Sequence, residues 1–320
     1  MLRTDKIQRS TSSAGSPILF VPIPHGRGLR LCVDYRALNK VTIPNRYPLP
    51  IMQELQDRVQ GAQWFTKMDL KNRFHLIRIR DGDEWKMTFR TWNGLYEFQV
   101  MPFRLTNAPS TFQDMMNHVF SDMLDVRLLV YMDDILMYAQ TQEEHDSQVK
   151  KVLERLPENG LAVSPGKCVW RLQEVKFLGY NIGKDGIKMS PEKVEAVLSW
   201  KRPGSLTDTQ SFLRFGNFYK RFIPNYSGVA CPLIELTKGE GKNWTWNPQA
   251  EAVFEELKCR FTTVPVLAHF DSQRPVIIET EASTSRSVRC YPNETKKGNC
   301  TRWLFTPGRS SPWNQLRNPR

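Results

Sequence analysis

Three acidic residues stand inside or at the end of apolar runs, where an ionised side chain needs a specific reason. Asp133 and Asp134 interrupt the run LLVYMDDILMY at 128–138, and Asp69 ends the run WFTKMD at 64–69. Removing a carboxylate from water is costly unless a partner compensates, and Mg²⁺ binds through one or two carboxylates plus phosphate oxygens. If the three carboxylates meet at strand ends of one sheet, they predict a two-metal site for phosphoryl transfer. One ion would activate the attacking hydroxyl and the other would stabilise the leaving pyrophosphate.

Simpler interpretations exist for both segments. Asp133-Asp134 alone is compatible with the tip of an ordinary β-hairpin, although the tip offers no Gly or Asn for the favoured two-residue turns. Asp69 alone is compatible with a helix cap or a turn residue at the end of a strand. The residues by themselves leave these alternatives open.

The composition is that of a folded protein with anionic partners. The chain has 320 residues, 40% hydrophobic and 24% charged, and 45 Lys and Arg against 33 Asp and Glu give a formal charge of +12. This length corresponds to about two domains at ~150 residues each, and the positive surplus indicates nucleic acid first and an anionic membrane second. No apolar run approaches the ~20 residues of a membrane-spanning helix. The 6 cysteines lack CxxC spacing, which argues against a zinc site or disulfide framework and predicts an intracellular, cytoplasmic protein.

Hydrophobic periodicity predicts a mixed chain with a mostly helical second half. Period-two alternation predicts strands at 29–34, 64–69, 75–79, 85–89, 96–100, 127–138 and over 161–189, and a last strand ending at Glu281. Helices are predicted at 51–60, over 107–124, after a Thr141 cap, and from Ser190-Pro191, Thr207 and Asn247-Pro248. The first 25 or so residues and residues 282–320 are rich in Ser, Pro and Gly, which predicts an unfolded start and a disordered tail.

YMDD at 131–134 resembles the signature of reverse transcriptases, and further motifs follow in the order of that family. They are LRLCVDYRALNKVT (29–42), NRYPLP (45–50), FTKMDL (65–70), MPFRLTNAPSTFQ (101–113), GLAVSPGKC (160–168) and VKFLGY (175–180). The helical segments SFLRFGNFYKRFIPNYS (211–227) and KNWTWNPQAEAVFEELK (242–258) are similar to gypsy-type long-terminal-repeat retrotransposon polyproteins. The resemblance covers residues 15–281.

The resemblance implies an α+β fold, the right-hand polymerase with fingers, palm and thumb and an antiparallel palm sheet. A partial connection or ribonuclease H-like segment follows. The implied divisions are a truncated fingers edge (1–24), fingers and palm as the reverse transcriptase catalytic domain (25–182), the thumb (183–243), the start of the connection or ribonuclease H-like domain (244–281) and the disordered tail (282–320).

The implied activity is that of an RNA-directed DNA polymerase, which adds deoxynucleotides from their triphosphates to a primer 3′-hydroxyl on an RNA or DNA template. Asp69, Asp133 and Asp134 match the magnesium ligands, with Mn²⁺ as a substitute, and Lys167 matches a palm lysine placed to protonate pyrophosphate. The implied nucleotide-binding residues are Arg30, Phe74 as a steric gate against a 2′-hydroxyl, Gln113 on the polar side of its helix, Tyr131 and Met132. The implied primer grip is Phe177, Leu178, Gly179 and Tyr180. The implied thumb contacts to the duplex backbone are Lys201, Arg202, Arg214, Lys220 and Arg221.

Several positions depart from the family pattern. Arg73 and Arg104 stand where the family has glycine or another small residue beside the nucleotide pocket, and Arg214 replaces a thumb glycine. A long cationic side chain there would either block the pocket or add phosphate affinity. PIPHGRG (22–28) replaces the lysine-rich fingers turn, and TEAS (280–283) has Glu281 in place of the ribonuclease H aspartate, which predicts no ribonuclease H activity. These departures keep a second hypothesis open, a catalytically inactive nucleic-acid-binding remnant of a decayed retroelement.

Overall fold

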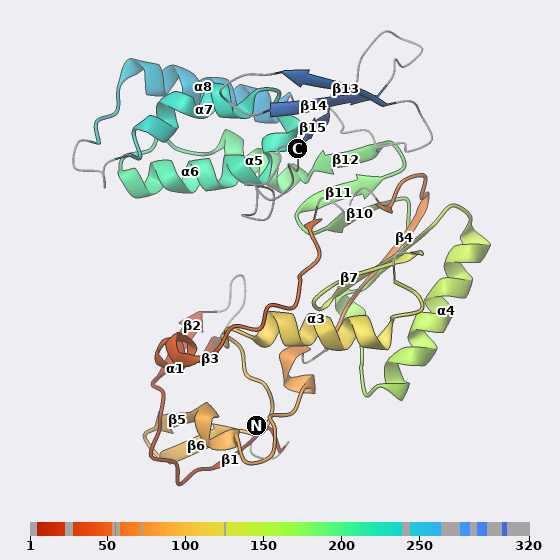
Figure 1. Cartoon of the computed structure of the whole chain (residues 1–320), viewed down its shortest axis with the longest axis vertical. Coiled ribbons are helices and arrows are strands. Elements are labelled where there is room, and N and C mark those ends of the chain that lie inside the picture. Colours follow the sequence, from red (N-terminus) through yellow and green to blue (C-terminus); the bar gives the residue numbers. More distant parts are fainter. Residues whose placement is uncertain are drawn as a thin grey trace, which may run out of the picture. The chain divides into compact units, whose positions relative to one another are not determined.

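The computed structural model describes residues 5–22, 28–52, 55, 58–71, 73–124, 126–238 and 244–263, and the backbone of strands at 276–281, 287–292 and 303–305. The chain divides into two compact units, Met1–Val175 and Lys176–Arg320, whose elements are labelled in Figure 1. Among the described residues, no helix combines the length and the apolar character needed to cross a membrane.

The first unit is built around an antiparallel sheet of four strands in the order β7-β8-β4-β9. β4 (Trp64–Asp69) pairs on one side with β8 (Asp134–Ala139) and on the other with β9 (Val169–Leu172). β7 (Leu128–Tyr131) forms a hairpin with β8. The predicted strand at 64–69 and the two half-strands around the paired aspartates are therefore confirmed.

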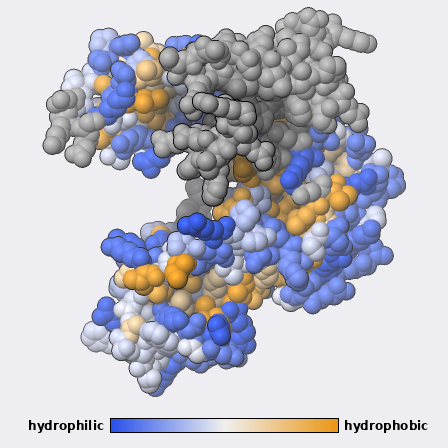
Figure 2. Space-filling view, in the orientation of Figure 1, coloured by the Kyte–Doolittle hydropathy of each residue, from blue (hydrophilic) through white to orange (hydrophobic). Residues whose placement is uncertain are grey.

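Helices α3 (Ala108–Val119) and α4 (Gln142–Glu158) pack against this sheet, as Figure 1 shows for β4 and β7. The side chain of Thr141 accepts a hydrogen bond from Glu144 N, as the predicted cap requires. Alternate strand residues and one stripe of each helix form a single core, whose members include Met68, Ile135, Met137, Phe112, Met116, Val152 and Leu156. Since side chains alternate along a strand, Lys67 and Asp69 lie on the opposite face from Met68. The exposed side of α4 is charged and appears blue in Figure 2.

Two smaller sheets complete the first unit. β1 (Ile7–Arg9) pairs with β6 (Gly94–Phe98), which pairs with β5 (Thr88–Thr91). β2 (Ile18–Pro22) pairs with β3 (Leu29–Val33), and the short helix α1 (Arg36–Val41) follows. The prediction of an unfolded start is wrong at β1 and β2, because Ile7 and Ile18 pack against a core formed by residues that include Tyr35, Phe89 and Phe98.

The predicted strand at 75–79 is also wrong. Residues Arg73–Leu76 form a 3₁₀ turn, η2, and a second one, η3 (Glu84–Met87), precedes β5. Phe74, Leu76, Ile77 and Ile79 all pack against the main core, and no extended strand can direct residues 76 and 77 to the same side. The prediction that these apolar residues are buried was correct, but their spacing is not that of a strand.

The next sheet along the chain has three strands, β10 (Glu174–Phe177), β11 (Tyr180–Gly183) and β12 (Gly186–Met189), and the boundary between the two units falls within β10. Over the described residues 190–238 and 244–263, helices α5 (Pro191–Leu198), α6 (Leu206–Phe218), α7 (Tyr226–Glu235) and α8 (Pro248–Thr262) follow, with the 3₁₀ turn η5 (Lys220–Phe222) after α6. Asn247 caps α8 as predicted, accepting from Ala250 N at 2.8 Å, whereas α6 is capped by Ser205 and so starts before Thr207. The core of these helices is aromatic, and the ring centroids of Phe212 and Phe254 lie 4.8 Å apart.

A last sheet contains β13 (Val276–Glu281), β14 (Ser287–Pro292) and β15 (Trp303–Phe305). β13 confirms the predicted final strand, whereas β14 and β15 lie in the tail predicted to be disordered. Short runs such as VRCY and WLF were hidden there by the polar composition around them. The rest of that tail and most of the PIPHGRG segment lie outside the described residues. Of the predicted helix at 51–60, residues 53, 54, 56 and 57 lie outside them as well, whereas Met52, Leu55 and Arg58 are helical.

Candidate active site

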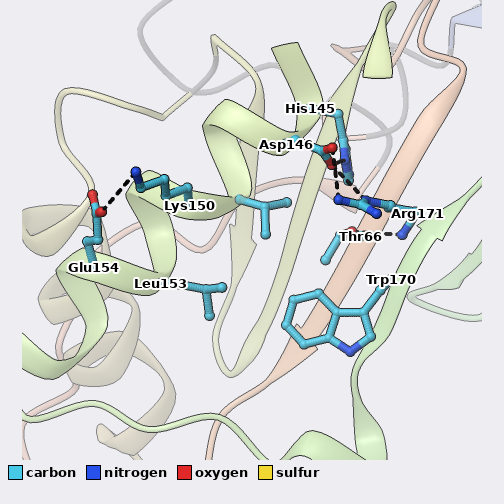
Figure 3. Close-up of a pocket in the computed structure, with 9 residues that line it drawn as sticks. Thr66, His145, Asp146, Lys150, Leu153, Glu154, Trp170 and Arg171 are labelled. Carbon is cyan, nitrogen blue, oxygen red and sulfur yellow. Dashed lines mark hydrogen bonds and ion pairs between the residues drawn. The ribbon is translucent and has the colours of Figure 1, made fainter. Parts of the chain in front are cut away.

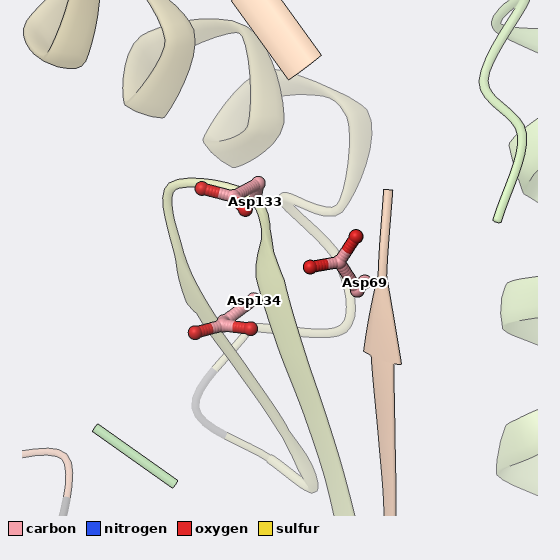
Figure 4. A group of neighbouring side chains, drawn as sticks. All are labelled: Asp69, Asp133 and Asp134. Carbon is pink, nitrogen blue, oxygen red and sulfur yellow. The ribbon is translucent and has the colours of Figure 1, made fainter. Parts of the chain in front are cut away.

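The ends of β4 and β8 bring the three acidic residues together. Asp69 is the last residue of β4, Asp134 faces it as the first residue of β8, and Asp133 precedes Asp134 in the connecting turn. One carboxylate oxygen from each residue lies within 4.8 Å of the others (Figure 4). Leu70 N donates to Asp133 O at 3.3 Å, which links the two segments through the backbone. The structure therefore confirms that these carboxylates meet in space, and we call them the triad.

Asp133 of the triad stands on a strained two-residue turn. Tyr131 pairs with Asp134, so that Met132 and Asp133 alone form the turn. Met132 has a φ of 53°, the left-handed region that costs a non-glycine residue on the order of 1 kcal/mol or more. The expectation that a tip without Gly or Asn disfavours a tight turn is thus wrong, and strain is held in place at the site.

Gln113 of α3 supports that turn from beneath. Its Oε1 accepts from Met132 N at 2.7 Å, and its Nε2 donates to Val130 O at 3.1 Å and to Asn117 Oδ1 at 2.8 Å. The side chain is fully buried. This corrects the placement of Gln113 on the polar side of its helix, because its polar atoms are used inside the protein to hold the turn.

Three cationic side chains surround the triad. Arg73 bridges two carboxylates, with Nη2 at 3.0 Å from Asp69 Oδ2 and Nε at 2.8 Å from Asp133 Oδ2. Lys67 Nζ lies 2.9 Å from Asp134 Oδ1, and Lys167 Nζ lies 3.6 Å from Asp69 Oδ1. Lys67 was missed from the sequence, although strand alternation from Asp69 already places it on the same face. The predicted contribution of Lys167 is compatible with its position, because its side chain is exposed and close to Asp69.

The triad has the chemistry of a cation site. Asp69 is only 8% exposed, and its Oδ1 has no hydrogen-bond partner among the described residues. Burial raises the pKa of Asp133, an effect that Arg73 opposes and the neighbouring Asp134 and Asp69 reinforce. A buried oxygen without a donor and three acceptor-only groups at this spacing fit a hard divalent cation with oxygen ligands.

An aromatic group lies next to Arg73 in the sequence and the fold. The ring of Phe74 is half-buried and meets Phe103 at 5.4 Å and Phe112 at 5.5 Å, both edge to face. Phe103 is 37% exposed and was not singled out from the sequence, which carries no signal for it beyond its place in the MPFRL motif. Tyr131 and Met132 are half-buried on the hairpin, and Arg30 is exposed on β3.

The predicted primer-grip residues form a tight turn in the second unit. Leu178 and Gly179 connect β10 to β11, with φ of 49° and 86°. Tyr180 Oη donates to Phe218 O at 2.9 Å, and Tyr219 Oη donates to Gly179 O at 3.0 Å. Phe177 and Tyr180 are buried. The turn is therefore fastened to the end of α6.

The predicted thumb cations do not form one uniform surface. Arg202 is engaged with Glu251 at 3.2 Å and lies 5.6 Å from the centroid of the Trp246 ring. Arg221 is half-buried, and the other three are exposed: Lys201, Arg214 and Lys220.

A separate cavity of about 530 Å³ lies between α4 and β9 (Figure 3). The Arg171 guanidinium spans its wall to Asp146 with bonds of 2.8 and 2.9 Å. His145 is fully buried there, and neither ring nitrogen has a hydrogen-bond partner among the described residues. None of the triad residues lines this cavity.

The comparisons with known proteins agree with this geometry. Residues 24–182 match the family described as "Reverse transcriptase (RNA-dependent DNA polymerase)". The structure is similar to foamy viral protease-reverse transcriptase in complex with an RNA/DNA hybrid, with a TM-score of 0.81, 25% identity, and coverage of 96% of this chain and 42% of that one. A second structure of the foamy viral protein, in complex with double-stranded DNA, has a TM-score of 0.83 and 27% identity. This match covers 96% of this chain and 54% of that one. Residues 24–182 therefore belong to the reverse transcriptase family, and the predicted α+β polymerase fold is confirmed.

Among curated proteins, the chain is similar to retrotransposon polyproteins. It is 38% identical over 282 residues to the Transposon Tf2-3 polyprotein of Schizosaccharomyces pombe, covering 88% of this chain and 21% of the polyprotein. The Transposon Tf2-7 polyprotein of the same yeast matches equally well, at 38% over 282 residues. The chain thus spans about a fifth of the length of the polyproteins it matches, 21% in each case.

Proposed function

We propose that this chain is the polymerase part of a gypsy-type long-terminal-repeat retrotransposon polyprotein. It would add deoxynucleotides to the 3′-hydroxyl of a primer paired with an RNA or DNA template. The observation that carries the proposal is the triad itself, whose three oxygens lie within 4.8 Å of each other in a reverse transcriptase domain. The two foamy viral structures hold an RNA/DNA hybrid and double-stranded DNA, and the formal charge of +12 supports similar partners here.

Two Mg²⁺ ions, or Mn²⁺ in their place, are the proposed cofactors, and Asp69, Asp133 and Asp134 would hold them. When bound, such ions supply Lewis-acid stabilisation of the charge that develops on the attacking and leaving oxygens. The protein's own contribution would be to fix the three oxygens at paired strand ends. Lys167, whose exposed ammonium lies 3.6 Å from Asp69 Oδ1, would give a proton to the departing pyrophosphate.

The remaining predicted site residues would bind substrates. Phe74 would form the floor under the sugar, since its ring is held edge-on by Phe103 and Phe112, and Arg30 would pair with the triphosphate from an exposed strand position. The turn with Tyr131 and Met132 would lie against the nucleotide, and Gln113 would act on it only through this turn. The Phe177–Tyr180 turn would support the primer end, and the cations at 201, 202, 214, 220 and 221 would contact duplex phosphates.

The division into fingers and palm (25–182), thumb (183–243) and the start of a connection or ribonuclease H-like domain (244–281) remains part of the proposal, as do an intracellular location and the lack of ribonuclease H activity. An RNA/DNA hybrid cleaved by the purified chain would contradict the last of these.

Primer extension tests the proposal. The purified chain, a labelled DNA primer annealed to RNA, the four deoxynucleoside triphosphates and Mg²⁺ or Mn²⁺ should give elongated primer. Asp133→Asn should reduce the rate on the order of a hundredfold or more. Asp122→Asn is the matched control, because Asp122 is paired with Arg155 away from the triad, and it should retain the rate. Equal rates for Asp133→Asn and the wild-type chain would refute the proposal.

The second candidate, a nucleic-acid-binding remnant without catalysis, is favoured by one specific observation. Arg73 and Lys67 already compensate the charges of the triad. Salt-dependent binding of primer–template, together with no extension under either metal, would support this candidate.

A further inference from the structure

We propose that Arg73 is a built-in cation of the triad, which occupies the space between Asp69 and Asp133 and must swing out before a divalent ion can bridge these carboxylates. The inference deepens the proposed function, on which it rests, by naming the residue that sets the metal affinity of this chain.

The guanidinium of Arg73 fills the space that a bridging ion would need. The guanidinium contacts the two carboxylates through different nitrogens, at 3.0 Å to Asp69 Oδ2 and 2.8 Å to Asp133 Oδ2. An ion bridging the same two oxygens would need the volume that these nitrogens fill. Ligand distances for hard divalent cations are ~2.0–2.6 Å, so the ion and the guanidinium cannot share both oxygens.

The backbone at Arg73 is strained in the conformation that directs its side chain to the triad. Arg73 has a φ of 41°, a conformation that disfavours every residue with a Cβ and suits glycine. Arg73 is the first residue of the η2 turn, four residues after Asp69. From this position its long side chain reaches back to the carboxylates at the end of β4. A strained conformation persists where surrounding contacts hold it, and the contacts seen here are the two ion pairs.

The charges at the triad are already balanced by side chains of the protein. Asp69, Asp133 and Asp134 face the positive charges of Arg73, Lys67 and Lys167. The triad is therefore compensated without metal, and a divalent ion gains less from entering than it would at three unpaired carboxylates. The Arg73 side chain is 40% exposed, which leaves it a path into solvent.

The expected size of the effect follows from competition. If the guanidinium occupies the site about nine-tenths of the time, the apparent metal affinity falls about tenfold relative to the open site. Removing the guanidinium should recover that factor, and removing a triad carboxylate as well should abolish the gain.

Metal binding measured without nucleic acid or nucleotide tests this inference. We would titrate Mn²⁺ into the full chain and follow the free ion by electron paramagnetic resonance. Arg73→Gly should bind Mn²⁺ about tenfold more tightly than the wild-type chain, and Arg73→Gln should show the same direction. Arg73→Gly combined with Asp133→Asn should lose the tight site.

Arg171→Gly is the matched control. Arg171 is also an arginine with positive φ (50°) that pairs with an aspartate, Asp146, and it makes no contact with the triad. This variant should bind Mn²⁺ like the wild-type chain. As a second readout, Mn²⁺ should raise the melting temperature of Arg73→Gly more than that of the wild-type chain, because at one ligand concentration the folded state is stabilised more by a ligand that it binds more tightly.

The outcomes separate the inference from the proposed function. Equal Mn²⁺ affinity in the wild-type chain, Arg73→Gly and Arg73→Gln would overturn the inference, whatever the polymerase assay shows. Tighter binding in the two variants, with no extension by any of them, would uphold the inference and count against the polymerase. A similar gain in Arg171→Gly would also overturn the inference, since it would show a general effect of losing a positive charge.

Discussion

Replacement of Gln113 by leucine should loosen the turn that carries Asp133 while leaving the rest of the first unit folded. Gln113 is fully buried, and its side chain is joined to Met132 N, Val130 O and Asn117 Oδ1. Leucine has a similar volume but no polar atoms. Met132 then loses the acceptor that holds its amide in the strained conformation with φ 53°.

The size of the effect can be worked from these contacts. A typical intramolecular hydrogen bond contributes about 1 kcal/mol net, and a buried group left without a partner costs about 1–3 kcal/mol. Loss of the bonds to Met132 N and Val130 O should therefore destabilise the turn by about 2–4 kcal/mol. Asn117→Ala is the matched control, since it removes the bond to Gln113 on the side away from the turn and the bond that Asn117 Nδ2 donates to Tyr47 Oη, but neither bond to the turn. It should cost about 2 kcal/mol and leave the turn in place.

Hydrogen exchange measures this effect locally. The Met132 amide should exchange about 30-fold faster or more in Gln113→Leu, because about 2 kcal/mol corresponds to that factor. Amides in the middle of α4 should keep the wild-type rate. Unchanged exchange at Met132 in a folded Gln113→Leu variant would refute the claim that this glutamine holds the turn.

Three further predictions concern stability, pH and substrate choice. Arg104 is exposed and has a φ of 74°, a conformation that is strained for a residue with a Cβ. Arg104→Gly should therefore raise the free energy of unfolding in urea by about 0.5–1 kcal/mol, whereas Arg104→Ala, which keeps a Cβ, should not. Burial, together with the positive charge of Lys6, lowers the pKa of His75 from 6.5 to about 4. The unfolded chain therefore binds a proton at this residue more readily than the folded chain. The free energy of unfolding should fall as the pH drops from 6.5 to 4, by about 3 kcal/mol in total. His75→Gln should remove that loss in unfolding experiments across this pH range, whereas the same change at the exposed His118 should leave it. Phe74→Val should raise ribonucleotide incorporation relative to deoxynucleotide incorporation by about 10–100-fold in competition assays, and unchanged discrimination would exclude the ring as a gate.

The sequence predicted that the three carboxylates meet because Asp69 ends one strongly apolar run and Asp133-Asp134 interrupt another. Alternation over 64–69 and 128–138 allows few placements, and the antiparallel pairing puts Asp69 opposite Asp134. The order of the motifs then identified the family, so that the fold of the first unit was predicted more securely than its individual side chains.

What the sequence did not reveal depends on local backbone geometry. The cationic bridge by Arg73 requires a positive φ and a 3₁₀ turn where the pattern predicted a strand. The inward position of Gln113 follows from the hydrogen-bonding needs of a turn in another element. Pairing of β1, β2, β14 and β15 was missed because polar neighbours obscured their short apolar runs.

Single-turnover incorporation of one nucleotide tests most directly the claim that the triad performs templated nucleotidyl transfer. A labelled DNA primer on an RNA template would be mixed with the chain, Mn²⁺ and each deoxynucleoside triphosphate in turn. We expect extension by one residue with the nucleotide complementary to the template base, and loss of that extension in Asp69→Asn. Extension that persists in Asp69→Asn, or that ignores the template base, would contradict it.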